Sequence, residues 1–451
     1  MTTRAMTSGE IVGQTAAHGF ATWSSQRGWK PLHVVDADGC HFVDACGRRY
    51  LDFSSQLVCS NLGHKNPAIA DAIAAEARRI AYLSPAFALE IRAEAGGALA
   101  EVTPSGLDKF FFSTSGTEAN EAAFKMARAV TGRSKIISRY HSYHGSTGGS
   151  IAASGDHRRW AADPSGMASG FRFAPDAYCY RCPFRWRHPE CDLACANYVE
   201  HMIEHEDDIA AVLVEPIVGV NGVIVPPDGY LRRLREICSQ HGVLLIADEV
   251  MTGWGRTGDW FAVNHWGVVP DILTTAKGVT AAYLPLGVTA VSPEVAAHFD
   301  DHVLPHGHTY EGHPVSLAAA VAAIREYRAN DLIGRARRLG PRLGEQLRQL
   351  QVTHPSVGDV RGIGLFWAIE LTKDRGRRLP FNTRKEKAAG DPLVVNLVVA
   401  EALRHGVSVV GWINHLVIAP PLIVTEAELT EGVAGLDEAL KVSDDLVTAR
   451  D

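Results

Sequence analysis

The sequence lacks three features that would define other classes of protein. It has no uninterrupted run of about 18 apolar residues, so we expect no membrane span. Basic residues do not dominate, with 44 Lys and Arg against 51 Asp and Glu, which argues against a nucleic-acid-binding surface. The first residues, Met1 to Gly13, are polar and hold no apolar core of a signal peptide. We therefore expect a cytoplasmic protein that binds neither membrane nor nucleic acid.

Cysteine is also scarce, with eight residues in a chain of 451, which does not fit the disulfide framework of a small secreted domain. Four of them stand close together, at Cys179, Cys182, Cys191 and Cys195. That spacing is compatible with a tetrahedral zinc site or an iron–sulfur site. The alternative, which we favour, is that these are reduced, buried thiols that act as small apolar side chains.

The most informative segment joins a buried strand to a lysine. The apolar run at 243–247 ends at Asp248, a glycine-rich turn follows at 253–258, and Lys277 stands between small residues after the next apolar run. Such a lysine can form a Schiff base, and a carboxylate at a strand end can hold the protonated pyridine nitrogen of pyridoxal phosphate (PLP). Taken singly, the two residues are more simply a surface lysine and a capping aspartate. Together they predict a PLP site.

Strands and helices alternate over most of the chain. Residues 32–53 suit an antiparallel arrangement of short strands, and a helix is predicted at 67–80. From about residue 84, near-continuous apolar strands alternate with helices, which predicts a mostly parallel sheet covered on both faces. We predict an α/β fold with three parts: an N-terminal segment at 1–83 that belongs to the small domain, a large PLP-binding domain at 84–330, and a small α+β C-terminal domain at 331–451.

Polar groups follow the predicted strands at their carboxyl ends, where open α/β sheets bind ligands. Ser115, Gly116 and Thr117 open a helix after a strand, so their backbone N–H groups and the helix dipole can bind a phosphate. A plain helix N-cap is the simpler interpretation of these three residues alone. Glu215 ends another strand beside a proline, where a glutamate can simply cap a turn.

These motifs, in this order, make the chain resemble the class III (omega) aminotransferases, which are PLP enzymes of fold type I, the aspartate-aminotransferase-like fold. The resemblance covers nearly the full length, and its motifs are residues 115–121, 142–147, 248–258 with Lys277, 308–314 and 419–422. Within the family the chain is closest to taurine–pyruvate-like aminotransferases, which share the cysteine-bearing insertion and the segment at 53–58.

The resemblance implies a set of site residues. Lys277 and Asp248 would be catalytic, Tyr143 would stack on one face of the pyridine ring and Val250 would pack against the other. Thr309 would reach the phosphate of the neighbouring subunit, which implies a homodimer or a tetramer. The cofactor contacts would be Ser115, Gly116, Thr117, Tyr143, His144, Glu215, Asp248, Val250, Lys277 and Thr309.

The chain departs from the family where substrate is expected to bind. Many relatives carry a mobile arginine before the segment at 419–422, and its planar guanidinium binds the acceptor's carboxylate. Residues 409–415 read Val-Val-Gly-Trp-Ile-Asn-His and contain no arginine. Val58 and Trp412 are candidate pocket residues instead, although Trp412 can equally be a packing residue.

The predicted function is that of a transaminase. It would move an amino group from an omega-amino acid or amine, taurine-like or beta-alanine-like, to a 2-oxo acid such as pyruvate. Lys277 would bind PLP and then move a proton, and Asp248 would keep the pyridine nitrogen protonated. The alternatives are an aminomutase or a decarboxylating enzyme of the same fold, and a non-catalytic binding protein, against which the presence of Lys277 and Asp248 argues.

Overall fold

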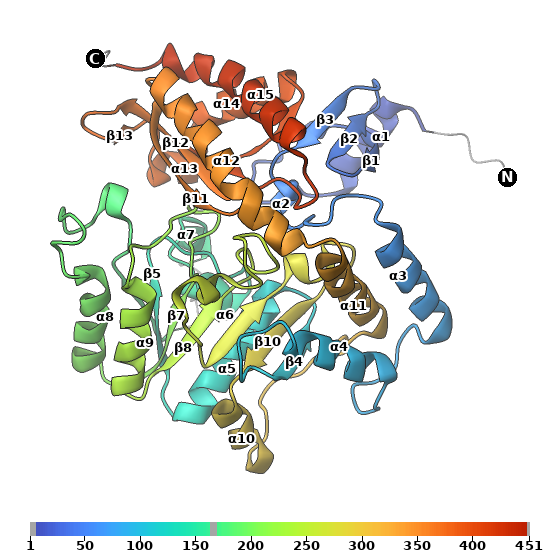
Figure 1. The fold of residues 1–451 in the computed structure, drawn as a ribbon, viewed down its shortest axis with the longest axis vertical. Helices are drawn as coiled ribbons and strands as arrows, with labels where there is room; N and C mark the ends of the chain where they lie inside the picture. Colours follow the sequence, from blue (N-terminus) through green and yellow to red (C-terminus); the bar gives the residue numbers. More distant parts are fainter. Residues whose placement is uncertain (1–5, 163–168, 449–451) are drawn as a thin grey trace.

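The computed structural model describes residues 6–162 and 169–448. Figure 1 shows a larger lower part built around one central sheet and a smaller upper part in which the N-terminal and C-terminal segments meet. None of the helices in the described ranges is long and apolar enough to cross a membrane.

The lower part contains a seven-stranded sheet with the order β4-β10-β9-β8-β7-β5-β6. In that order the strands are Lys109–Ser113, Gly287–Val291, Ile272–Thr275, Leu244–Asp248, Ile209–Val214, Lys135–Arg139 and Phe171–Ala174. β10 is antiparallel to both neighbours, whereas β5 to β9 pair in parallel. β7 is buried along its whole length, as a strand covered on both faces must be. The predicted α/β fold with a mostly parallel sheet is confirmed.

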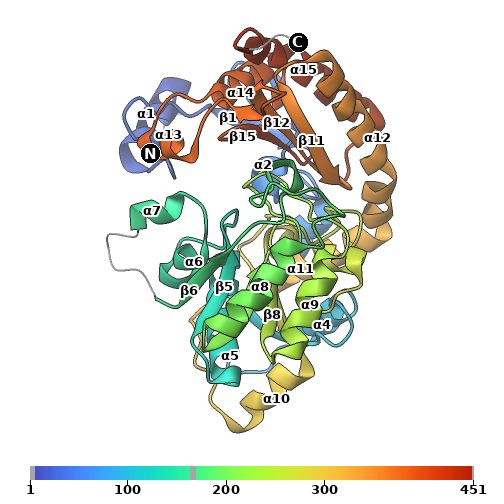
Figure 2. The same cartoon turned by 90° about the vertical axis from the view of Figure 1, so that its left-hand side faces the viewer.

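Helices pack around this sheet, as Figures 1 and 2 show from two sides. α5 buries Ala119, Ala122 and Ala123 among other residues, and the small side chains of these alanines allow the helix axis to lie close to the strands. The helices of the lower part are α3 Pro67–Arg79, α4 Glu90–Ala100, α5 Gly116–Thr131, α6 Gly148–Ala153, α7 Arg158–Ala162, α8 Ala194–His205, α9 Tyr230–Gln240, α10 Pro293–Asp301 and α11 Pro314–Ala329, with the short 3-10 helices η2 Cys179–Arg181, η3 Ala262–Trp266 and η4 Lys277–Thr280.

The upper part contains two further sheets. The first, in the order β1-β2-β3-β14, is Val34–Asp38, His41–Asp44, Arg49–Asp52 and Val407–Ser408. The second, in the order β11-β12-β16-β15, is Val357–Ile363, Phe366–Asp374, His415–Ile418 and Val410–Trp412, and β13 Leu379–Pro380 pairs with β12. The helices are α1 Ser8–His18, α2 Ser55–Val58, α12 Leu332–Thr353, α13 Arg384–Ala389, α14 Val394–Arg404 and α15 Glu426–Asp444. Parallel pairing of β3 with β14 joins the two ends of the chain in one sheet.

The predicted elements are present, with small differences at their ends. The antiparallel arrangement of β1, β2 and β3 is confirmed, and α3 ends one residue before the predicted end of its helix. The strand predicted at 407–410 is in fact two strands, because the chain passes at Val409 from the sheet of β14 to the sheet of β15. β5, β7, β8 and β9 run in parallel, so the residues that follow them gather at one edge of the central sheet.

Candidate active site

Asp248, the last residue of β8, is held by three partners. Its Oδ2 accepts a hydrogen bond from Asn120 Nδ2 at 2.9 Å and lies 2.7 Å from His144 Nδ1, and its Oδ1 accepts from the backbone N–H of Val250 at 3.1 Å. The side chain is almost completely buried. A fixed, buried carboxylate of this kind is suited to hold the protonated nitrogen of a heterocycle.

His144 contacts Asp248 rather than an open space. Its ring is buried, with Nδ1 on Asp248 and Nε2 at 3.4 Å from the hydroxyl of Ser138. The geometry therefore makes His144 a positioning residue for Asp248. Direct contact of His144 with a cofactor stays a prediction.

Lys277 opens η4 immediately beyond the end of β9. Its φ is +49°, a left-handed backbone conformation that residues other than glycine rarely adopt. The amino group donates a hydrogen bond to the carbonyl of Leu57 at 3.1 Å, and the neighbours of Leu57 in α2, Gln56 and Val58, also have positive φ values of 58°. Backbone strain of this kind persists at functional sites because the surrounding structure enforces it.

The surroundings of Lys277 favour the neutral amine. Burial lowers the pKa of Lys277, and the guanidinium of Arg158 acts in the same direction, while Cys59 and Asp248 oppose them. A neutral amine is the nucleophilic form that attacks a carbonyl. The geometry thus supports the Schiff-base role predicted for this residue.

The start of α5 forms a tight turn with open backbone donors. The hydroxyl of Ser115 accepts a hydrogen bond from the backbone N–H of Glu118 at 3.3 Å, so Ser115 is the N-cap of the helix. A Cβ atom at Gly116 would lie 2.7 Å from Val250 Cγ2, and one at Gly145 would lie 2.5 Å from Thr117 Oγ1. The first N–H groups of a helix have no acceptor inside it, so this crowded turn is suited to bind a phosphate.

Glu215 fixes the turn that carries Tyr143. Its two carboxylate oxygens accept hydrogen bonds from the backbone N–H groups of Tyr143 at 3.0 Å and Gly219 at 2.6 Å. Burial raises the pKa of Glu215. The turn-capping interpretation therefore holds for this residue, and a contact with the cofactor's phenolic oxygen stays a prediction.

Arg158 is a site residue that the sequence analysis missed. Its guanidinium lies over three aromatic rings, 3.8 Å from the centroid of Tyr143, 4.4 Å from Trp412 and 5.4 Å from Trp23. Asp156 holds it through Nε and Nη2, both at 3.0 Å. Within the described part of the chain, its Nη1 makes no hydrogen bond.

The signal for Arg158 was present but ambiguous. Asp156 and Arg158 follow the motif at 142–147, yet nothing in the order of residues places Trp23 and Trp412 beside them. Asn120 was also missed as a partner of Asp248, although it stands inside the motif at 115–121.

The two predicted substrate residues lie in different surroundings. Val58 is 4% exposed and belongs to a buried apolar cluster. Trp412 is half-buried, and its Nε1 donates to the side-chain oxygen of Asn221 at 3.3 Å. Trp412 contacts Arg158, whereas Val58 packs in its apolar cluster, and a substrate contact of either residue stays a prediction.

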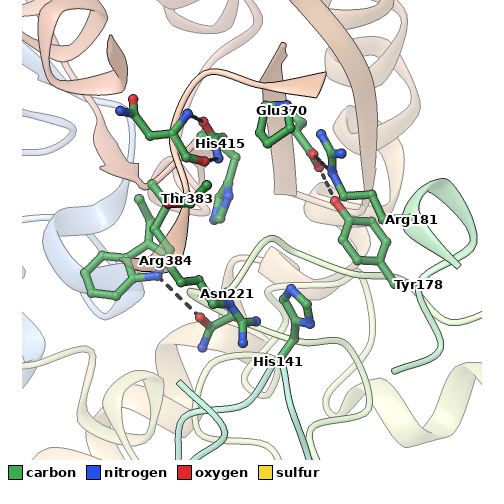
Figure 3. Close-up of a pocket in the computed structure, with 13 residues that line it drawn as sticks. His141, Tyr178, Arg181, Asn221, Glu370, Thr383, Arg384 and His415 are labelled. Carbon is green, nitrogen blue, oxygen red and sulfur yellow. Dashed lines mark hydrogen bonds and ion pairs between the residues drawn. The ribbon is translucent and has the colours of Figure 1, made fainter. Parts of the chain in front are cut away.

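A cavity of about 190 Å³ adjoins Trp412 (Figure 3). Its walls come from both parts of the molecule and include His141 and Asn221 below and His415 and Glu370 above. Burial lowers the pKa of His415 to about 4, so this ring is neutral near pH 7. Arg384 of α13 reaches across to donate to the carbonyl of Tyr140 at 3.0 Å, which links the small part of the molecule to the loop that leads to Tyr143.

The four clustered cysteines are free thiols with unequal exposure. Cys195 is buried, Cys182 and Cys191 are half-buried and Cys179 is exposed. Among the described residues, no three of these thiols are gathered closely enough to share one metal ion. Burial raises the pKa of Cys195 to about 12, which favours the neutral thiol. The favoured expectation that all four are buried is wrong, because only Cys195 is buried. Zinc binding by the four stays a prediction.

Thr309 is exposed in the loop that precedes α11, and its carbonyl accepts a hydrogen bond from the hydroxyl of Tyr82 at 2.7 Å. The side chain therefore faces away from the protein's own core.

Comparisons with known proteins agree with this geometry. Residues 24–440 match the family described as aminotransferase class III. The solved structure of a taurine:2-oxoglutarate aminotransferase from Bifidobacterium kashiwanohense, in complex with PLP and glutamate, is 38% identical, with a TM-score of 0.92 and coverage of 98% of this chain and 100% of that one. A taurine–pyruvate aminotransferase from Bilophila wadsworthia is 34% identical over 95% of this chain and 96% of its own length. A leucine/methionine racemase from Thermococcus litoralis is 36% identical over 91% of each.

The chain belongs to the class III aminotransferase family, with PLP fold type I and PLP as its cofactor. The residues present fit that cofactor, because a buried carboxylate, a strained lysine and an open helix N-terminus lie at one edge of the sheet. When bound, PLP supplies an electron sink that allows a proton to leave the substrate carbon.

Proposed function

We propose that the chain transfers the amino group of a small amine that carries an acidic group, such as beta-alanine or taurine, to a 2-oxo acid such as pyruvate. The observation that carries this proposal is Arg158, a buried arginine at the site of Tyr143 and Lys277. Names of relatives that act on taurine support the donor class.

Arg158 has the properties of an anion-binding residue. Asp156 fixes the plane of its guanidinium, and the bonds to Asp156 leave Nη1 for a ligand. Aromatic rings around it exclude water, which strengthens a charge-assisted hydrogen bond to a carboxylate or sulfonate. Arg158 thus takes the place of the arginine that is missing from residues 409–415.

The remaining residues bind and orient. Lys277 accepts and releases a proton at Nζ, since its neutral form is favoured. Asp248, fixed by Asn120 and His144, stabilises positive charge on the ring nitrogen of the cofactor. Tyr143, whose ring lies beneath Arg158, stacks on the cofactor, so Arg158 is held close to the cofactor.

The direct test is a panel of donors with PLP-loaded enzyme and pyruvate, with alanine formation as the readout. Taurine and beta-alanine should form alanine at least about tenfold faster than propylamine, which has no acidic group. Equal rates for all three donors, or no alanine from any of them, would contradict the proposal. Conversion of L-leucine to its mirror image without pyruvate would instead favour a racemase.

The active unit is a homodimer in which Thr309 completes the site of the neighbouring chain. Support comes from the exposed position of Thr309 and from exposed apolar residues near it, which are Tyr82, its neighbour Leu83, and Tyr310. Exposed apolar side chains gathered in this way are typical of a protein interface. The eight free cysteines also support a reducing, cytoplasmic location.

A mixed dimer tests the shared site. One subunit carries Lys277→Ala and its partner carries Thr309→Ala, so a threonine acting across the interface leaves one complete site. That dimer should retain PLP in one site as tightly as wild type and keep about half of the activity. If the threonine acted within its own chain, neither site would be complete and PLP would be held weakly in both. The Thr309→Ala homodimer is the control, because both of its sites lack the hydroxyl under either arrangement.

A further inference from the structure

The last turn of α8 presents three potential metal ligands on one exposed face. His201, Glu204 and His205 follow the spacing i, i+3 and i+4, which places side chains side by side on a helix. One ligand atom of each residue lies within 4.8 Å of those of the other two. α8 lies on the outside of the lower part beside α9, away from the active site (Figures 1 and 2).

The histidine geometry is already that of a ligand pair. The Nδ1 atom of His205 lies 2.8 Å from the carbonyl of His201, and the ring centroids of the two histidines are 4.0 Å apart. A ring N–H that donates to a backbone carbonyl leaves the lone pair of Nε2 free for a metal, which is the arrangement usual for metal-binding histidines. Little rearrangement is needed, because ligand atoms around a tetrahedral zinc ion lie about 3.4 Å from one another.

Charge favours a cation at this position. The C-terminal turn of a helix is its negative end, and α8 ends at His205. Glu204 adds a carboxylate, whereas the following acidic residue, Glu206, is already paired with Lys135 at 3.1 Å and Arg172 at 2.9 Å. Two imidazoles and one carboxylate suit zinc, nickel or copper rather than magnesium or calcium, which prefer oxygen ligands.

A second histidine pair offers a comparison within the same molecule. His298 lies in α10, and His302 is the residue that follows this helix. These two histidines are also four residues apart, and their ring centroids lie 4.2 Å from each other. The Nδ1 atom of His302 lies 2.9 Å from the carbonyl of His298. Among the described residues this pair is not part of a group of three suitable ligands, unlike the pair in α8. The two pairs therefore differ chiefly in the third ligand.

We propose that His201, Glu204 and His205 form a surface site for a zinc-class divalent cation that fastens the C-terminal turn of α8. The site is separate from the PLP chemistry and from the cysteine loop. Binding stabilises the folded state, since the three ligands are brought together only by the helix.

The test is a titration of the PLP-loaded enzyme with zinc chloride alone. Calorimetry measures the binding, and the thermal unfolding midpoint measures the effect on stability. Wild type should bind about one zinc ion per chain at this site and unfold at a higher temperature. His205→Ala and His201→Ala should each weaken zinc binding by about tenfold or more and abolish the rise in unfolding temperature. Even the loss of a residue that only supports a metal ligand weakens metal binding by about that factor. Glu204→Gln should weaken binding less than loss of a histidine.

Two controls assign the signal. His298→Ala with His302→Ala should leave the tight binding unchanged. Cobalt titration distinguishes the cysteine loop, because thiolate ligands give intense near-ultraviolet absorption that imidazole and carboxylate ligands do not. If the three α8 variants bound zinc as tightly as wild type, or if the signal vanished with the α10 pair or carried thiolate absorption, the proposal would be overturned. His201, Glu204, His205 and His302 are exposed and His298 is half-buried, so none of these side chains belongs to the buried core and the variants should fold.

Discussion

The cofactor side of the active site and its substrate side are held in different ways. On the cofactor side, Asp248, Asn120 and His144 form a buried network of hydrogen bonds at the end of parallel strands. On the substrate side, Arg158 is paired with Asp156 and is surrounded by the faces of Tyr143, Trp23 and Trp412, of which the two tryptophans come from distant segments. The cofactor side is fixed by the sheet, whereas the substrate side depends on how loops from both parts of the molecule meet.

This difference predicts that changes on the two sides have separable effects. Changes on the cofactor side should affect all substrates alike, because every substrate uses the same cofactor. Changes on the substrate side should discriminate among substrates and leave PLP bound.

The largest effect is expected from Lys277→Ala. Turnover should fall about 10²- to 10⁴-fold for every donor, because the base that moves the proton is lost. The protein should remain folded and still bind PLP without a covalent bond. Borohydride reduction of wild type followed by peptide mapping should place the pyridoxyl group on Lys277, and finding it on another lysine would overturn the assignment.

Asp248→Asn should reduce activity about 10²- to 10³-fold, again without regard to donor, since an amide does not stabilise a protonated ring nitrogen. Asn120 and His144 still surround the position, so the fold should persist. Activity assays and the thermal unfolding midpoint, measured together, check both statements. Wild-type single-turnover rates would contradict the role of Asp248.

Trp412→Leu should have a smaller effect that falls on the substrate side alone. Loss of its contact with Arg158 corresponds to about 0.5 to 2 kcal/mol, or about a 2- to 30-fold rise in KM for beta-alanine. The absorbance of bound PLP and kcat should change little. An equal rise in KM for propylamine would show that Trp412 is only a packing residue.

The smallest effect concerns stability far from the site. His354 lies 2.6 Å from Asp444 and 2.9 Å from Asp437, and although burial acts in the opposite direction, these carboxylates raise the pKa of His354. Because the folded pKa exceeds the unfolded value, the stabilisation is fully present below about pH 6.5 and is lost as pH rises through the raised pKa. His354→Asn should therefore lower the free energy of unfolding most at acidic pH, by about 1 kcal/mol, and progressively less at higher pH. The thermal unfolding midpoint, measured over a range of pH, checks this.

The same comparison explains what the sequence could predict. Lys277, Asp248 and the start of α5 could be predicted because each lies within a short motif at a strand end, where neighbours in the sequence are also neighbours in space. Arg158 was missed because its neighbours Trp23 and Trp412 stand about 135 residues before it and about 254 residues after it, and only the fold brings them together. Val58 was chosen by resemblance, and the structure places it in a buried apolar cluster, so its contact with substrate stays a prediction.

The most direct test of the account is the specificity of Arg158→Leu. The quantity to measure is the ratio of kcat/KM for beta-alanine to kcat/KM for propylamine, with Arg377→Leu as the control because the Arg377 side chain is 80% exposed. The ratio should fall about 30-fold or more in Arg158→Leu, because removal of one partner of a buried charge pair weakens binding by at least that factor. The Arg377→Leu control should keep the wild-type ratio. A variant that loses activity equally toward both donors, or that keeps the wild-type ratio, would contradict recognition of an acidic donor by Arg158.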